Sequence, residues 1–211
     1  MFNIRYAQIR TMDISNGSNV GCSLFVQGCP FIPHCPNCFN SETWDFNGGK
    51  EWTEETEKEF LDLIDRPYIK RVSILGGEPL AEQNLDGVLD LITTIRKKYP
   101  IFKKSDSANP CKMGVSEGEN SDKIRLFSDK TIWLYSGYTW NQIFPYGVTQ
   151  MDLSQHEITR QEILKNVDVF IDGRYIDSQR DITLKWRGSK NQRVIDVQES
   201  LKQNKVVLYC D

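Results

Sequence analysis

The sequence lacks any long apolar run. No segment of its 211 residues approaches the roughly 20 consecutive apolar residues that a transmembrane helix needs. Residues 1–15 also lack the apolar core of a secretory signal peptide. We therefore expect a cytoplasmic protein that has no membrane partner.

The sequence has no strong excess of charge of either sign. It contains 26 Lys and Arg residues against 29 Asp and Glu residues, for a formal net charge of -3. This balance gives no basic patch for nucleic acid or anionic lipid, and neither is expected as a partner. Charged residues at 26% and hydrophobic residues at 39% are typical of a globular protein. The length and the absence of internal repeats predict a single domain over residues 1–211.

Histidine is also scarce, with two residues, whereas six cysteines are present. Without a secretion signal, this many cysteines indicates metal or redox chemistry rather than a disulfide framework. Three of the six fall within the ten-residue segment 29–38. The other three are scattered, and no role is assigned to them: Cys22, Cys111 and Cys210.

Strand-like and helix-like patterns alternate along the chain. Short apolar runs that end in glycine or polar residues are followed by segments with apolar residues at helical spacing. The polar composition of about residues 103–129 indicates a surface insertion. The expected elements are strand 21–28, helix 53–64, strand 72–75, a helix ending before Pro100, a strand from Thr131, helix 156–166 and strand 167–173. This order predicts an α/β fold with a mainly parallel sheet and functional loops at the carboxyl ends of its strands.

The cysteine segment follows the first of these strands directly. Cys29, Cys35 and Cys38 can place three thiolates on three corners of an iron-sulfur cube. A structural zinc site takes four ligands, so the missing fourth ligand favours a cluster with one iron open to a small molecule. The alternative is a zinc-stabilised binding module in which Cys22 or His34 completes the site. Cys22 lies within the strand, and a domain of this size needs no zinc for stability.

At this point the motifs resemble a known family. The segment GC(x5)C(x2)CFN after one strand and GGEP after the next resemble the radical S-adenosylmethionine superfamily. The further segments WLYSGYTW, VDVFIDGRY and LKWRGSKNQRVID make nearly the whole chain similar to activating proteins of anaerobic ribonucleoside-triphosphate reductase. The resemblance implies a partial (βα) barrel. Sibling possibilities are an activase for a different glycyl-radical enzyme and a small-molecule synthase.

The resemblance also implies an activity and its partners. It implies an oxidoreductase similar to formate C-acetyltransferase-activating enzymes, with a 4Fe-4S cluster and S-adenosylmethionine as cofactors. In such enzymes the reduced cluster cleaves S-adenosylmethionine, and the resulting radical takes a hydrogen atom from a glycine of the partner. The implied partner is anaerobic ribonucleoside-triphosphate reductase, and the implied electron donor is a protein such as flavodoxin. This chemistry needs no histidine dyad, and the presence of only two histidines in the sequence is consistent with it.

The resemblance assigns site residues as well. Cys29, Cys35 and Cys38 would bind iron, while Gly76, Gly77 and Glu78 would approach the methionine amino group. The remaining cofactor-binding residues are expected beside the last cysteine and at two strand ends: Asn37, Cys38, Phe39, Tyr135, Ser136, Asp172 and Arg174. Ordinary core packing of Phe39 and a strand-end salt bridge of Asp172 or Arg174 are open alternatives. Trp186, Arg187 and Arg193 are candidates for docking the partner, although Trp186 could pack in the interior instead.

Two features depart from the family pattern. The first cysteine spacing is five residues instead of the usual three, so the loop must bulge to hold the same cube. The usual lead-in Gly-Pro-Gly-x-Arg is replaced by residues 17–21, which contain no arginine.

Overall fold

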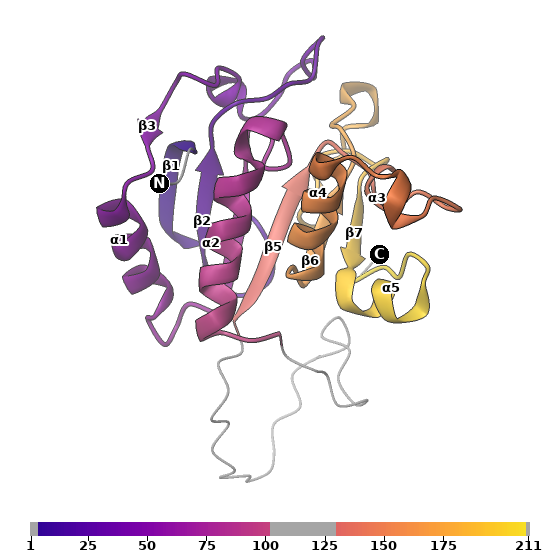
Figure 1. Ribbon diagram of the computed structural model, residues 1–211. Coiled ribbons are helices and arrows are strands. Elements are labelled where there is room, and N and C mark those ends of the chain that lie inside the picture. The colour runs from indigo at the N-terminus through magenta and orange to yellow at the C-terminus, as the bar shows by residue number, and fades with distance from the viewer. Residues whose placement is uncertain (1–3, 102–129, 210–211) are drawn as a thin grey trace, which may run out of the picture.

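A computed structural model describes residues 4–101 and 130–209, and one seven-stranded sheet runs through them (Figure 1). The strand order is β3-β1-β2-β4-β5-β6-β7. The strands are β1 (Arg5–Asp13), β2 (Gly21–Val26), β3 (Lys50–Glu51), β4 (Arg71–Gly76), β5 (Thr131–Ser136), β6 (Val169–Asp172) and β7 (Arg193–Asp196). The four central strands β2, β4, β5 and β6 are parallel, and antiparallel strands flank them on both sides. The predicted α/β class with a mainly parallel sheet is confirmed.

The helices lie on one face of the sheet, and all but the last connect parallel strands. They are α1 (Glu54–Ile64), α2 (Leu85–Lys98), α3 (Trp140–Ile143), α4 (Gln155–Lys165) and α5 (Val197–Gln203), with short 3-10 turns between them. Strand order advances in one direction from β2 to β6, and right-handed crossovers then place every connecting helix on the same side (Figure 1). On the opposite face of the parallel strands, residues 4–101 and 130–209 place no α-helix.

Each predicted helix whose start carries a capping residue begins directly after that residue. Thr53 caps α1 by accepting a hydrogen bond from the Thr56 amide at 3.2 Å, and three glutamates occupy the first turn. Ser154 and Glu157 form a capping box at the start of α4. The helices predicted at 53–64, before Pro100 and at 156–166 are therefore confirmed.

Alternation along the strands separates two apolar layers. Leu24, Ile74, Leu134 and Phe170 point toward the helices and belong to the main core. Trp133 on β5 points the other way and forms a second, smaller cluster with β6 and β7. Further along this helix-free face, toward the carboxyl ends of the strands, the sheet borders a cavity instead of a packed core.

Three strands lie outside the predicted alternation. β1 pairs antiparallel with β2, β3 adds two residues beyond β1, and β7 pairs antiparallel with β6. In β1 most residues are only half buried or exposed, so the strand has no apolar run to mark it. The expected insertion 103–129, with Cys111, and also Cys210 lie outside the described residues.

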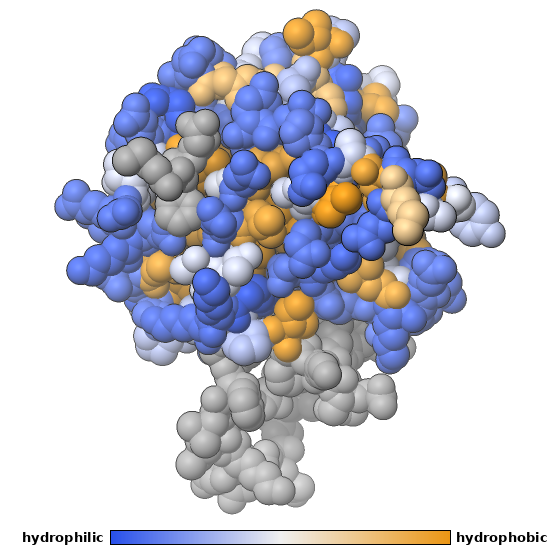
Figure 2. Space-filling view, viewed as in Figure 1, coloured by the Kyte–Doolittle hydropathy of each residue, from blue (hydrophilic) through white to orange (hydrophobic). Residues whose placement is uncertain are grey.

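Hydrophilic side chains cover most of the helical face, and apolar side chains are exposed there in small separate groups (Figure 2). Within residues 4–101 and 130–209, no helix has both the length and the apolar character to span a membrane.

Candidate metal and cofactor site

The cysteine loop is anchored at both ends by the backbone. The Gly28 amide donates to the Thr43 carbonyl at 2.8 Å, and the Cys29 amide donates to the Trp44 carbonyl at 3.0 Å. Gly28 has φ +95°, and a Cβ there would lie 2.0 Å from the Phe46 ring, so a side chain is excluded. The loop that begins at Cys29 therefore leaves β2 in a fixed direction, over the carboxyl ends of the parallel strands.

All three cysteines of the loop line one cavity of about 640 Å³, a size typical of ligand pockets. Their thiols are free. The cavity also includes every other predicted cofactor-binding residue except Asn37 and Asp172. The members are Cys29, Cys35, Cys38, Phe39, Gly76, Gly77, Glu78, Tyr135, Ser136 and Arg174. The structure thus brings together residues that are up to about 140 positions apart.

The cavity offers the three thiols of one loop as donors, a set that suits an iron-sulfur cube. Among the residues that the structure describes, no three His, Cys, Asp or Glu side chains converge on one metal position. The two residues considered as a fourth zinc ligand are engaged elsewhere. Cys22 is buried, with its thiol donating to the Thr11 carbonyl at 3.3 Å, and His34 stacks on Trp44 with 4.1 Å between ring centroids. Three thiols facing a roomy cavity can hold three corners of a cube and leave the fourth accessible.

The thiols need deprotonation before they can bind metal. Burial, together with the nearby charges of Glu78, Cys35 and Cys38, raises the pKa of the Cys29 thiol to about 11. Cluster assembly must therefore release protons from this loop, and we expect it to be more complete at alkaline pH.

The two glycines after β4 make a close backbone contact with the end of β2. A Cβ on Gly77 would lie 2.2 Å from the Gly28 carbonyl oxygen, and Gly76 has φ +114°. The Glu78 amide then donates to the same Gly28 carbonyl at 2.7 Å. The glycines thus bring the GGEP segment directly against the residue that precedes Cys29, and they give the cavity a wall of bare backbone.

Glu78 is buried, and its carboxylate links two strand ends. It accepts hydrogen bonds from Ser136 Oγ at 2.7 Å, from the Gly137 amide at 2.7 Å and from the Leu80 amide at 2.9 Å. The side chains of Glu78 and Ser136 therefore hold the cavity wall in shape. Burial raises the pKa of Glu78 to about 7, although these hydrogen bonds oppose the shift.

This pKa predicts a pH dependence of stability. Between the ordinary pKa of 4.5 and about 7, the folded state binds more protons than the unfolded state. The free energy of unfolding of the metal-free protein should therefore fall by about 3 kcal/mol as pH rises through this window, and then level off. Urea denaturation at about pH 5 and about pH 8 measures it, with Glu78→Gln as the non-titrating comparison. Equal pH slopes for the two proteins would contradict the prediction.

Residues after β6 hold the cysteine loop from its other side. The Arg174 guanidinium donates to the Pro33 carbonyl and lies 5.0 Å from the centre of the Phe31 ring. Asn37 Nδ2 donates to Asp177 Oδ2 at 3.0 Å, which places its side chain outside the cavity. Arg174 and Asn37 thus position the loop, and their contact with a cofactor stays a prediction.

Asp172 and Trp186 have structural contacts. Asp172 is 1% exposed and accepts hydrogen bonds from Arg193 Nε at 3.0 Å and from the Trp140 amide at 2.8 Å. It therefore joins β6 to β7 and to the start of α3, away from the cavity. Trp186 packs edge-on against Trp133 with ring centroids 5.0 Å apart, the interior role considered for it, while also bordering the cavity.

The segment between β1 and β2 forms a further wall of the cavity that no sequence pattern predicts. Ser15 and Asn16 line the cavity, and a fully buried Arg71 holds this segment in place. Arg71 donates to the carbonyls of Asp13 at 2.6 Å and Ser18 at 3.1 Å, and also to that of Asn16. No local pattern marks this role, because Arg71 simply opens an apolar strand.

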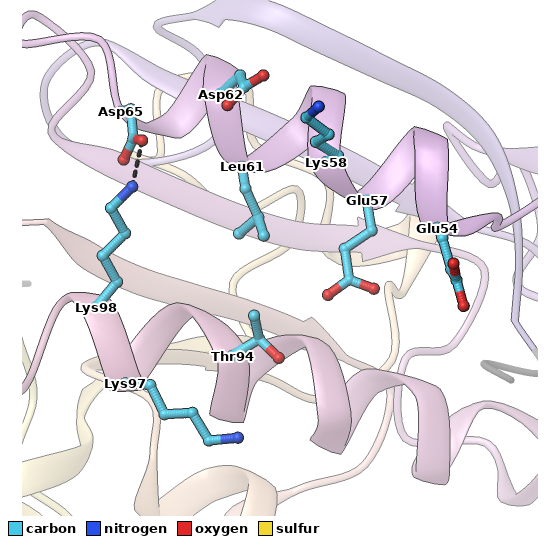
Figure 3. Close-up of a pocket in the computed structure, with 9 residues that line it drawn as sticks. All are labelled: Glu54, Glu57, Lys58, Leu61, Asp62, Asp65, Thr94, Lys97 and Lys98. Atoms are coloured by element: carbon cyan, nitrogen blue, oxygen red, sulfur yellow. Dashed lines mark hydrogen bonds and ion pairs between the residues drawn. The ribbon is translucent and has the colours of Figure 1, made fainter.

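A separate hollow of about 760 Å³ lies between α1 and α2 (Figure 3). Its lining is mainly charged, and Lys98 pairs across it with Asp65. Leu61 points into the hollow from α1, the helix that also carries Glu57 (Figure 3). The hollow contains no cysteine and no predicted site residue, so the candidate chemistry lies in the cysteine cavity alone.

The fold and the cysteine cavity together define an α/β protein with a candidate iron-sulfur site. The family model described as a 4Fe-4S single cluster domain matches residues 15–107 and 121–195, and this range includes the cysteine loop and all four parallel strands. The chain belongs to this family and, within it, to the anaerobic ribonucleoside-triphosphate reductase-activating proteins.

Curated relatives with that name cover almost the whole chain. The protein of Vibrio cholerae is 31% identical over 191 residues, covering 90% of this chain and 96% of the relative. The protein of Escherichia coli K12 is 29% identical over 193 residues, covering 90% and 97%. That of Enterobacteria phage T4 is 28% identical over 193 residues, covering 90% and 93%.

Proposed function

We propose that this protein uses a 4Fe-4S cluster on Cys29, Cys35 and Cys38 to cleave S-adenosylmethionine reductively, and so generates a glycyl radical on anaerobic ribonucleoside-triphosphate reductase. One observation carries the proposal. Three free thiols of a single loop line the same cavity as Gly76 and Gly77, and the fourth described cysteine, Cys22, lies outside that cavity. This arrangement suits a cluster with one iron available to a ligand.

The bound cofactors supply the electron transfer and the radical chemistry. The protein holds the cofactors in position and shields them from solvent. The cysteine loop holds the metal over the carboxyl ends of the parallel strands. The backbone of Gly76 and Gly77 forms the adjoining wall, where polar groups can approach the methionine moiety. Glu78 and Ser136 keep that wall rigid through their buried hydrogen bond.

The partner is proposed from the relatives and from the cavity mouth. The relatives are named as activators of anaerobic ribonucleoside-triphosphate reductase. Phe39 and Ile182 border the cavity and are 62% and 85% exposed, so two apolar side chains lie at the opening among polar ones. Such a rim suits contact with another polypeptide. The proposal also includes the fold and the reaction class. A partial (βα) barrel has its helices on one side of parallel strands, as they lie over β2, β4, β5 and β6. We therefore propose this barrel, with chemistry similar to that of formate C-acetyltransferase-activating enzymes.

Anaerobic reconstitution with iron and sulfide tests the proposal. We expect a brown protein that binds S-adenosylmethionine and, once reduced, produces a glycyl radical signal on its cognate reductase in electron paramagnetic resonance. Reductase from which the radical glycine has been removed by substitution with alanine is the matched control and should give no signal. Cofactor cleavage without a radical on the reductase would favour a different radical enzyme. A colourless protein with stoichiometric zinc would favour the binding module.

A further inference from the structure

A position where the family pattern has arginine lies next to a buried arginine of another strand. The family lead-in Gly-Pro-Gly-x-Arg ends in arginine, whereas the corresponding residues 17–21 end in Gly21, the first residue of β2. In the parallel pairing of β2 with β4, Gly21 lies directly opposite Arg71. Arg71 is the first residue of β4, and its side chain is fully buried. The arginine missing from β2 thus has a neighbouring arginine on β4.

The Arg71 side chain occupies the space that a side chain at position 21 would need. A Cβ on Gly21 would lie 2.9 Å from both Cζ and Nε of Arg71, and 2.7 Å from its carbonyl oxygen. A Cβ on Gly17 would lie 2.5 Å from Arg71 Cδ. Because atoms that are not bonded to one another do not approach so closely, two long side chains cannot share this space. The fold has room for one guanidinium here, and β4 provides it.

Both positions point to the same face of the sheet. Cys22 and Val72, the next residue of each strand, belong to the main core on the side of the helices. Alternation along a strand therefore directs Gly21 and Arg71 to the opposite face. Neighbouring strands lie about 4.8 Å apart, a distance that an arginine side chain can span. A guanidinium can therefore reach the same place from either strand.

The Arg71 guanidinium holds the segment between β1 and β2 at three points. It donates to the carbonyls of Asp13 at 2.6 Å and Ser18 at 3.1 Å, and also to that of Asn16. The Asp13 carboxylate continues this network, since it accepts from the Ser15 amide at 2.7 Å and from Asn16 Nδ2 at 2.5 Å. Ser15 and Asn16 line the cysteine cavity, whereas Arg71 does not. Arg71 therefore acts on the cavity through the segment that it holds.

We infer that Arg71 is the relocated counterpart of the lead-in arginine. In this chain β4 supplies the guanidinium that the family pattern places on β2, and the guanidinium positions the cavity wall formed by Ser15 and Asn16. Arg71 is a positioning residue in this role, because it does not touch the cavity itself. The inference rests on the proposed function only for the effect of this wall on S-adenosylmethionine.

Moving the arginine back to β2 tests the inference. Arg71→Gly removes the guanidinium and should lower the urea midpoint of unfolding by about 1–2 M. The double variant Gly21→Arg/Arg71→Gly should recover about half of this loss or more, because glycine at position 71 vacates the space and lets the backbone there adjust. Gly21→Met/Arg71→Gly is the matched control. Methionine makes the same Cβ contacts and fills similar space without a guanidinium, so the control should recover little.

A second measurement separates positioning of the cavity wall from stability alone. On the anaerobically reconstituted proteins, under conditions in which they are folded, the Kd for S-adenosylmethionine should rise about tenfold in the methionine control. In the variant with the relocated arginine it should stay within about threefold of the unmodified protein.

The two double variants decide the outcome. Equal urea midpoints, equal Kd values or a relocated-arginine variant that does not fold would each overturn the inference. If the unmodified protein itself fails to bind S-adenosylmethionine, the proposed function fails separately, and the urea comparison of arginine with methionine at position 21 still tests the relocation.

Discussion

Replacement of Cys38 by alanine is expected to abolish cluster assembly and, with it, all radical formation on the reductase. With Cys29 and Cys35 alone, the loop offers two thiolates, and the other described cysteine, Cys22, is buried with its thiol bonded to the Thr11 carbonyl. With two ligands, two of the four irons have no cysteine bound to them, so the cluster is open to solvent and readily loses iron. Iron and sulfide analysis after anaerobic reconstitution, together with the visible absorption band, measures the effect directly.

Cys22→Ala is the matched control for this experiment. The Cys22 thiol is buried in β2 and donates to a backbone carbonyl outside the cavity. Its loss should cost about 1–2 kcal/mol of stability and leave iron content and activity unchanged. A Cys38→Ala protein that retains a full cluster, or a Cys22→Ala protein that loses it, would show that the ligands have been assigned wrongly.

Arg71→Met is expected to lower the free energy of unfolding by about 3–5 kcal/mol, the largest stability effect that we foresee. The Arg71 side chain is fully buried, and its guanidinium lies 3.8 Å from the Asp13 carboxylate, which is also buried. Methionine cannot replace its hydrogen bonds to the carbonyls of the segment between β1 and β2. The segment that carries Ser15 and Asn16 should then loosen, and one wall of the cavity with it.

Urea denaturation monitored by circular dichroism measures this loss, with Arg66→Met as the control. The Arg66 side chain is exposed and donates only to the Tyr68 hydroxyl at 3.1 Å, so its replacement should stay within about 0.5 kcal/mol. Equal stabilities for the two variants would mean that the Arg71 contacts are not formed in solution.

A good part of the site could be predicted because its chemistry is local. Cys29, Cys35 and Cys38 stand close together in the chain, so any fold that keeps the loop keeps the thiols together. The alternation of strands and helices then predicts the parallel sheet, and the parallel sheet predicts that GGEP and the end of β5 meet the cysteine loop. The cavity brings these residues together as expected.

What each polar side chain does there could not be predicted in the same way. Asp172 stands at a strand end like Ser136, yet it pairs with Arg193 on β7, a strand that carries no sign in the local pattern. Glu78 is fully engaged by the end of β5, although its motif marks it only as a neighbour of the glycines. Such pairings depend on which strands become neighbours, and a single sequence does not record that.

The sequence by itself determined the chemistry of this protein, because ligand spacing and strand-helix periodicity are properties of neighbouring residues. Only the tertiary structure decided which charged groups are satisfied by the fold and which remain available. Arg71 opens one strand and Arg187 stands before another, and nothing in the local sequence separates their roles. In the fold the first donates to several backbone carbonyls, whereas Nε of the second has no hydrogen-bond partner among the described residues. Burial makes that difference matter for stability, because a buried donor gives up its hydrogen bonds to water and needs a partner within the fold.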